Sequence, residues 1–495
     1  MLRDMKRIIL TVVAVSGYLF SYAQFDLKGR IENLPIGETV MVNAPFVFGY
    51  FDDMKTPLTT DEDGNFSVTL PLDEEKIGYL RWGDRQAFLW MRPGTDLTVE
   101  LDGSNGQIAF GGEMGGTNKL LHELELWKAP LFFTDSKRVA ANEMQDRVIQ
   151  PYMQQLAAKM AKVDASTLTP PEKEFLKAEL HYHFIGYVDL YVRTARWPRK
   201  EWSNFIIEFM QGETPQPKSA LQGPMYYSFI DAYVGFLANR AFSNRDDPTR
   251  FAASLDSVYG VNSFDSLMAL AREHGETFLN WMAVKRAFDA NTTERYLAQQ
   301  VKEKYDDGEV STGNKLLDAL ELHNRNSTYL DTLASIRASL MKRMATINND
   351  IIVPDDYRTF QQIKTFVKQF QGKVVYLDIW GTWCGPCKEE MRYLPSIKEH
   401  LEGKDIVFLY LDMDDDEKDN KWREYIQANA ITGVHLRKNN EDIQAIWKEL
   451  LPDDSSRHGR YPTYFIFDKQ GNLMVDDIKR PSDGQNLLKQ LEEYL

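Results

Sequence analysis

Residues 374–390 read VVYLDIWGTWCGPCKEE, and this stretch decides the fold of the C-terminal part of the chain. It opens with β-branched and aromatic residues, which are typical of a buried strand. The C-terminal end of this stretch favours a helix, because the proline of Gly385-Pro386 fits a first helical turn. Cys384 and Cys387, the only cysteines of the chain, are therefore predicted where a strand passes into a helix.

The sequence on both sides of this segment alternates between strand and helix patterns, which predicts an α/β sheet. We expect this last domain to span residues 351–495. Its expected helices cover 361–370, 421–429 and 487–495, and its further strands cover 406–411 and 464–467.

A cysteine at a helix start has an unusually acidic thiol, because free backbone N–H groups and the helix dipole stabilise the thiolate. This effect lowers the thiol pKa from about 8.5 toward about 7 in such sites. Cys384 is therefore the expected nucleophile. Cys387, one turn further along, is the expected resolving thiol, which attacks a mixed disulfide formed on Cys384.

The motif Trp383-Cys384-Gly385-Pro386-Cys387 after an apolar strand, together with Tyr461-Pro462-Thr463 before another strand, resembles the thioredoxin-like fold. More closely, it resembles the TlpA/ResA-like thiol-disulfide oxidoreductases of bacterial envelopes. The resemblance covers about residues 352–495. It implies a redox activity carried by the cysteine pair itself, with no cofactor.

Several roles follow from this resemblance, position by position. Asp378 matches a buried aspartate that takes the proton of the inner cysteine, and the alternative is a carboxylate that only bonds to backbone at the strand end. Glu390 matches a family glutamate, and its alternative is a solvated helix charge. Arg392 stands where the family has proline, which leaves the helix kink open. The expected partner-binding groove consists of Trp383, Gly385, Pro386, Tyr461 and Pro462, with a cis bond expected before Pro462.

The rest of the chain predicts a multidomain protein. Residues 24–116 carry short β-rich runs between turn signals, which favour an antiparallel, sandwich-like β domain of unknown function. Residues 117–350 carry apolar residues at helical spacing and predict an all-α region. The expected fold is thus β, then α, then a thioredoxin-like α/β domain.

The N-terminus has the three-part layout of a secretory signal, with Arg3, Lys6 and Arg7 before the apolar run 8–15 and small residues up to Ala23. We expect residues 1–23 to be removed after Ala23, an uncleaved membrane anchor being the alternative. This predicts a soluble periplasmic protein, because no cysteine follows the cleavage site to carry a lipid.

The formal net charge is −15 in a chain with 26% charged residues, which argues against nucleic-acid binding.

Three groups of residues could suggest a metal site, and each has a simpler interpretation. His181 and His183 lie two apart and point in different directions on a helix. His435 and His458 could join the cysteines around zinc, but Cys-Gly-Pro-Cys is typical of redox pairs. The acidic run 412–417 lacks calcium-loop spacing, which favours a solvated loop. We therefore expect no metal.

The leading hypothesis is an enzyme that reduces disulfides of exported proteins, since Gly-Pro between the cysteines resembles reducing thioredoxins at about −270 mV. A membrane protein is the expected electron donor, by analogy. One alternative is an envelope scaffold or ligand-binding protein with a vestigial thioredoxin module. A thiol peroxidase fits less well, because Gly-Pro-Cys follows the first cysteine. The sequence leaves the oligomeric state open.

Overall fold

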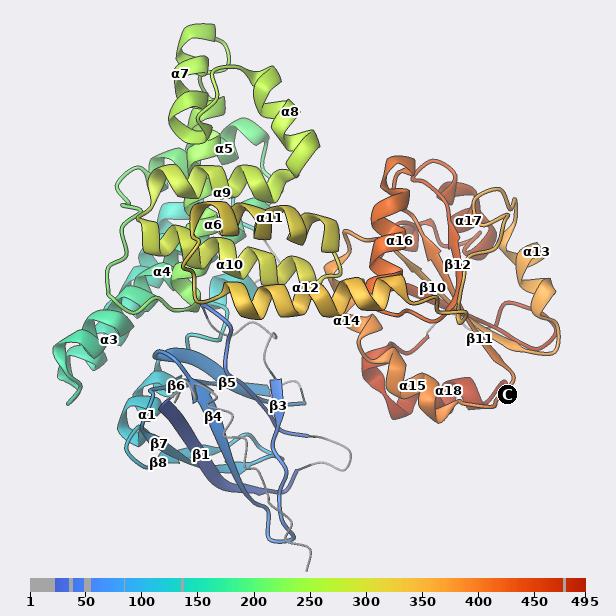
Figure 1. Ribbon diagram of the computed structural model, residues 1–495, viewed down its shortest axis with the longest axis horizontal. Coiled ribbons are helices and arrows are strands. Elements are labelled where there is room, and N and C mark those ends of the chain that lie inside the picture. Colours follow the sequence, from blue (N-terminus) through green and yellow to red (C-terminus); the bar gives the residue numbers. More distant parts are fainter. Residues whose placement is uncertain (1–22, 35–38, 49–54, 84, 135–137, 475–477) are drawn as a thin grey trace, which may run out of the picture. The chain divides into compact units, whose positions relative to one another are not determined.

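The computed structural model describes residues 23–34, 39–48, 55–83, 85–134, 138–474 and 478–495 (Figure 1). Apart from Ala23, the predicted signal peptide lies outside the described residues. The chain forms two compact units, residues 1–243 and 244–495. The helical region predicted for residues 117–350 therefore contributes to both units.

The first unit begins with two four-stranded sheets. One has the order β4-β1-β7-β8, from β1 (Ala23–Glu32), β4 (Asn65–Leu72), β7 (Asp96–Asp102) and β8 (Ile108–Gly111). The other has the order β3-β2-β5-β6, from β2 (Met41–Asn43), β3 (Lys55–Pro57), β5 (Lys76–Trp82) and β6 (Arg85–Met91). The predicted β region is confirmed, and its pairs are antiparallel except for the parallel pair of β1 and β7.

Helices complete this unit, as the apolar spacing predicts. They are α1 (Gly115–Leu124), α2 (Leu131–Thr134), α3 (Gln150–Ala165), α4 (Pro170–Thr194), α5 (Arg199–Met210) and α6 (Pro224–Phe242). The helix α4 begins where Glu172 accepts hydrogen bonds from the backbone N–H and the hydroxyl of Thr169, at 2.8 and 2.7 Å. One face of α4 forms part of the core, since the apolar residues at helical spacing along it are all buried: Leu176, Leu180, Phe184, Val188 and Tyr191.

The second unit starts with a helical segment and ends with the α/β domain. Its helical segment contains α7 (Pro248–Tyr259), α8 (Phe264–His274), α9 (Glu276–Ala287), α10 (Ala290–Asp306), α11 (Val310–His323) and α12 (Leu330–Ala345). No helix in the described part of the chain combines the length and the apolar character needed to cross a membrane.

The α/β domain contains a five-stranded sheet of order β13-β10-β11-β12-β9, in which β13 runs antiparallel to β10 and the other pairs are parallel. Its strands are β9 (Ile351–Ile352), β10 (Val374–Trp380), β11 (Ile406–Asp412), β12 (Gly433–Arg437) and β13 (Thr463–Phe467). Its helices are α13 (Ile363–Val367), α14 (Gly385–Met391), α15 (Leu394–His400), α16 (Asp419–Ala428), α17 (Ile443–Leu450) and α18 (Gln485–Glu492). The predicted α/β class is confirmed.

Two apolar clusters cover the two faces of this sheet. Residues of α13 and α17 pack on the face formed by Val375, Leu377 and Ile379. Residues of α14, α15, α16 and α18 pack on the opposite face, which includes Tyr376 and Trp380. Because side chains alternate along a strand, Asp378 lies on this second face, together with the cysteine-bearing helix.

A testable consequence concerns the free edge of β6, where Asn118 of α1 replaces a neighbouring strand. The side-chain oxygen of Asn118 accepts a hydrogen bond from the backbone N–H of Trp90 at 2.8 Å. The side-chain amide of Asn118 donates to the carbonyl oxygens of Trp90 and Met114, each at 3.0 Å. Asn118→Ala should lower the free energy of unfolding by about 2–3 kcal/mol, because buried backbone groups lose their partners. Urea denaturation measures this, with hydrogen exchange of β6 as a local readout.

The matched control is Lys119→Ala, which changes an exposed neighbour on the same helix and should alter stability by no more than about 0.5 kcal/mol. Unchanged protection of β6 in Asn118→Ala would contradict this account of the strand edge.

Candidate active site

The site is built at the carboxyl end of β10, whose residues are all buried. Cys384 is the cap residue of α14, and Cys387 lies in its first turn. Pro386 occupies an early helical position, where its missing N–H costs nothing. The strand-to-helix junction that the sequence predicts for the cysteine pair is therefore present in the structure.

Cys384 and Cys387 form a disulfide, with their Cα atoms 5.3 Å apart. The backbone N–H of Cys387 donates to Cys384 Sγ at 3.2 Å. The same donor can stabilise a thiolate on Cys384 after reduction. Cys384 is 3% exposed and Cys387 is fully buried, so Cys384 is the more accessible member of the pair.

Asp378 lies in β10 and is fully buried with it. Neither carboxylate oxygen has a hydrogen-bond partner among the described residues, so the structure does not place Asp378 in backbone bonding at the strand end. Burial raises the pKa of Asp378 well above its usual range, nearby Glu390 raises it further, and Lys398 acts in the opposite direction. The charged form is costly here because nothing replaces its hydration.

Glu390 is also buried, although the sequence allowed a solvated helix charge. Its two carboxylate oxygens accept hydrogen bonds from the backbone N–H and the hydroxyl of Ser482, both at 2.9 Å. Arg480 Nη1 lies 3.9 Å away. Glu390 thus ties the active-site helix to the turn that precedes α18, and its negative charge acts on Asp378.

The expected partner-facing residues come together around the disulfide. Trp383 is 53% exposed, and its ring lies edge-on to that of Tyr461, with centroids 5.5 Å apart. The bond between Tyr461 and Pro462 is cis, as expected. Gly385 and Pro386 are exposed beside Cys384. The structure therefore brings the cysteine loop and the cis-proline loop to one surface.

The sequence did not decide whether the helix breaks near Arg392, which stands where the family has proline. The break is present, although this position is not a proline. The helix α14 ends at Met391, and α15 begins at Leu394 with Pro395 in its first turn. Arg392 instead forms an ion pair with Glu389 at 3.0 Å. The departure from the family pattern therefore keeps the break and adds a cation to the outer surface of the helix.

The loop before Cys384 is held by a buried carboxylate that sequence reasoning missed. Asp414 accepts a hydrogen bond from Thr382 N–H at 3.3 Å and a short one from the Thr382 hydroxyl. A Cβ atom at Gly381 would lie 2.7 Å from Trp383 Nε1 and 3.1 Å from Asp414 Oδ1, so a larger residue there would have to displace the Trp383 ring. These contacts hold residues 381–383, which directly precede Cys384, in place.

The interpretation of residues 412–417 as a solvated loop is wrong for Asp412 and Asp414, which are fully buried. Arg437 lies beside Asp412 in the register of β11 and β12. Its guanidinium donates to Asp412 at 2.7 Å and to Asp419 at 2.8 Å. It also donates to the Asp414 carbonyl oxygen at 3.2 Å. The cation compensates the buried charge, which a pattern of acidic residues alone does not indicate.

The two carboxyl groups bound by Arg437 have different pKa values, because their surroundings differ. Burial raises the pKa of Asp412 to about 7, with a contribution from Asp414 that Arg437 opposes. Burial acts in the same direction on Asp419, but hydrogen bonds from Arg437, Arg423 and Tyr357 lower its pKa to about 2. Asp412 is thus the member of the network that titrates near neutral pH.

The helical segment of the second unit also reaches the active-site helix. Lys388, which follows Cys387, lies 3.8 Å from Glu309 and 3.9 Å from Asp307, in the connection between α10 and α11. Glu309 also pairs with Lys421 of α16 at 3.2 Å. Burial lowers the pKa of Lys388, while the two carboxylates oppose this shift.

The histidines considered as metal ligands have other partners. His435 is buried, its Nε2 lies 2.7 Å from the Ile431 carbonyl oxygen, and burial lowers its pKa to about 4. His458 Nε2 lies 2.9 Å from the Leu451 carbonyl oxygen. His183 contacts Tyr152 and Lys128, and His181 pairs with Glu213. Among the described residues, no group of three or more metal-ligating side chains comes together.

Comparison with known proteins gives the same picture for this domain. Residues 372–473 match the family model described as thioredoxin-like. Thiol-disulfide oxidoreductase ResA of Bacillus thuringiensis subsp. konkukian is 33% identical over 133 residues, which are 27% of this chain and 67% of the relative. ResA of Oceanobacillus iheyensis is 30% identical over 180 residues, which are 34% of this chain and 85% of the relative.

Among solved structures, a thiol:disulfide interchange protein from Bacteroides sp. shares 19% identity with a TM-score of 0.21, covering 26% of this chain and 76% of that chain. The fold and the cysteine pair define a thiol-disulfide oxidoreductase of the thioredoxin-like class. Within this class, the chain belongs to the ResA family, as its motifs indicated.

The buried network predicts a large cost for removing its cation. Arg437→Met should lower the free energy of unfolding by about 3–5 kcal/mol near neutral pH, because Asp412 and Asp414 lose their compensating charge. The loss should shrink as the pH falls below 7, since Asp412 then takes up a proton. Urea denaturation at several pH values measures both effects.

Arg423→Met is the matched control, because Arg423 also binds Asp419, at 2.9 Å, but has a side chain 42% exposed. This pair should contribute no more than about 1 kcal/mol. Equal losses in the two variants would show that burial of the Arg437 network carries no special cost.

Proposed function

We propose that this protein reduces disulfides of exported proteins in the periplasm by dithiol-disulfide exchange. The observation that carries the proposal is the Cys384–Cys387 disulfide at the start of α14, with its outer sulfur beside the exposed Trp383. Export is inferred from the layout of residues 1–23. The intact cysteine pair favours an enzyme over a scaffold with a vestigial module.

The first step is attack by the Cys384 thiolate on a disulfide of the partner. A bond forms between Cys384 Sγ and one partner sulfur, and the other partner sulfur leaves as a thiolate. The Cys387 N–H supports the attacking thiolate, since it already donates to Cys384 Sγ in the oxidised state. Trp383 and Tyr461 offer an apolar surface for the partner chain next to the sulfur.

The second step releases the reduced partner. Cys387 loses its proton and attacks Cys384 Sγ, so that the partner leaves as a second thiolate and the enzyme disulfide forms. We assign the proton to Asp378, which lies on the face of the sheet that carries α14. Because burial raises the pKa of Asp378, its ionised form is a strong base inside the protein.

The cycle leaves the enzyme oxidised and the partner richer by two electrons and two protons. A donor must therefore return two electrons and two protons to the cysteine pair. A membrane protein that carries electrons from the cytoplasm is the class of donor we propose, by analogy with related envelope systems. The reducing direction rests on the Gly-Pro dipeptide between the cysteines.

The mature chain should reduce insulin disulfides when a dithiol is supplied. Cys384→Ser should abolish turnover, since the nucleophile is lost. Cys387→Ser should trap a mixed disulfide on Cys384, because the variant has no second thiol that can displace the bound partner from Cys384. Insulin precipitation measures turnover, and non-reducing electrophoresis with mass spectrometry detects the adduct. Full turnover in either variant would exclude this mechanism and favour the scaffold alternative.

Asp378→Asn should act on the second step alone. Formation of the mixed disulfide should proceed at nearly the parent rate, whereas its resolution should slow by about ten- to a hundredfold near neutral pH. In the parent, resolution should accelerate as the pH rises and Asp378 ionises, and the variant should lose this component. Rapid-quench kinetics with a single-disulfide substrate separates the two steps.

Stability supplies an independent control for the same variant. A carboxyl group whose folded pKa is raised stabilises the folded state at low pH, and this contribution is lost as the pH rises. Asp378→Asn should therefore be no less stable than the parent at pH 8. A slower first step, or marked destabilisation at pH 8, would make Asp378 a structural residue.

A further inference from the structure

A pocket of about 780 Å³ lies in the helical segment of the second unit, away from the residues of the thiol site. It is formed by the end of α7, by α8 and α9, and by His323 at the end of α11. Apolar side chains of Leu270, Phe278, Trp281 and Met282 line it together with Tyr259. Its basic lining residues are Lys285, Arg286 and His323.

The aromatic lining is continuous. Phe278 and Trp281 have ring centroids 5.1 Å apart, and Trp281 and His323 are 5.2 Å apart. Trp281 is buried, and its indole Nε1 has no hydrogen-bond partner within the described parts of the chain. These rings give the pocket an apolar, aromatic wall.

The charged lining has one sign. Lys285 Nζ lies 5.2 Å from the Trp281 ring centroid and 3.3 Å from His323 Nδ1. Arg286 Nε donates to the Ser257 carbonyl oxygen at 3.0 Å. No carboxylate lines this pocket, and neither Lys285 nor Arg286 forms an ion pair with any residue that the structure describes.

The positions of these cations depend on local structure. Gly260 ends α7 in a left-handed conformation with φ of 73°, and a Cβ atom there would come within 3.0 Å of Arg286 Nη1. Glycine therefore leaves room for the guanidinium against the last turn of α7. Burial, reinforced by Lys285, lowers the pKa of His323, so near neutral pH the positive charge comes from Lys285 and Arg286.

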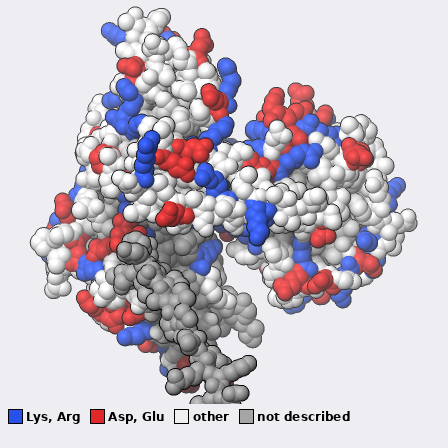
Figure 2. All heavy atoms as spheres, in the orientation of Figure 1, with Lys and Arg blue, Asp and Glu red and all other residues white. Residues whose placement is uncertain are grey.

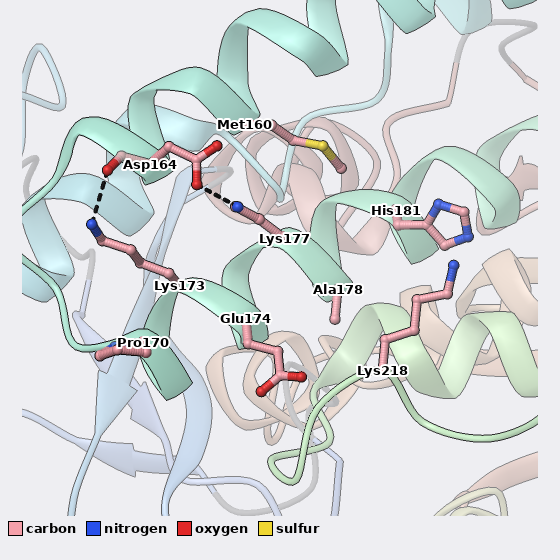
Figure 3. Close-up of a pocket in the computed structure, with 9 residues that line it drawn as sticks. All are labelled: Met160, Asp164, Pro170, Lys173, Glu174, Lys177, Ala178, His181 and Lys218. Atoms are coloured by element: carbon pink, nitrogen blue, oxygen red, sulfur yellow. Dashed lines mark hydrogen bonds and ion pairs between the residues drawn. The ribbon is translucent and has the colours of Figure 1, made fainter.

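The contrast with another basic pocket shows why this charge is unusual. In the first unit, Lys173, Lys177, Lys218 and His181 line a pocket of about 510 Å³ (Figure 3). There Lys177 pairs with the Asp164 carboxylate, and Lys173 donates to the Asp164 carbonyl oxygen at 2.8 Å. Glu213 binds His181 at 2.8 Å and lies 3.5 Å from Lys218. That pocket is neutralised from within, whereas the pocket at Lys285 is not.

We propose that the pocket at Lys285 binds a small carboxylate that carries an apolar, preferably aromatic, group. The carboxylate pairs with Lys285 and Arg286, and the apolar group packs against Phe278, Trp281 and Met282. The chain has a net charge of −15, and acidic and basic side chains are interspersed over the face that Figure 2 shows. The site therefore attracts an anion through its own cations and not through the charge of the whole protein. A free organic acid and the C-terminal residue of a polypeptide share this chemistry.

The test is calorimetric titration of the full mature chain with 3-phenylpropionate, with its neutral amide and with acetate. The acid should bind with a Kd on the order of 1 mM, and the amide and acetate at least about tenfold more weakly. A peptide N-acetyl-Ala-Ala-Phe with a free carboxyl group identifies the source, since tighter binding than 3-phenylpropionate favours a polypeptide end and weaker binding a free acid.

Lys285→Gln should weaken binding of 3-phenylpropionate by about five- to tenfold. Lys173→Gln, the same substitution in the neutralised pocket, should leave the affinity unchanged. Both variants should retain thiol-exchange activity, so this test is independent of the proposed redox function. Equal affinity for acid and amide, parent affinity in Lys285→Gln, or no saturable binding would overturn the proposal.

Discussion

The parallel pairing of β10 with β11 is the constraint on which the redox site depends. Trp380 lies opposite Asp412, and the N–H of Met413 donates to the Trp380 carbonyl oxygen at 3.0 Å. The two loops that leave these strands therefore start side by side, one toward Cys384 and the other toward Asp414. A one-residue slip of this pairing would turn the side chains of one strand over, so that Asp378 and Asp412 no longer lie on the same face of the sheet.

Burial raises the pKa of the carboxyl groups around this edge, but their hydrogen-bond partners differ. Asp378 has no hydrogen-bond partner among the described residues, and its raised pKa favours the protonated form. Asp419 instead accepts hydrogen bonds from Arg437 and Arg423, and its pKa falls to about 2. The low-dielectric interior thus favours the neutral form of Asp378 next to the cysteine-bearing layer, while the compensated carboxylates hold the loop.

The helices before the α/β domain are more than a spacer. Their charged connection at Asp307 and Glu309 contacts Lys388 of the active-site helix, and the backbone N–H of Ser311 donates to Glu424 of α16. The same segment contains the cationic, aromatic pocket at Lys285. The match to the thioredoxin-like family model covers residues 372–473, so these helices lie outside it.

The sequence by itself determined the elements and the chemistry that depend on neighbours along the chain. The apolar run of β10, the proline in the first turn of α14 and the spacing of Cys384 and Cys387 are local, and each was predictable. The tertiary structure alone decided which distant groups meet. Arg437 reaches Asp412 across 25 residues, Ser482 reaches Glu390 across 92, and Asp414 reaches Thr382 across 32. The acidic run looked solvated because a charge is costly to bury unless a partner compensates it, and only strand register and packing supply that partner.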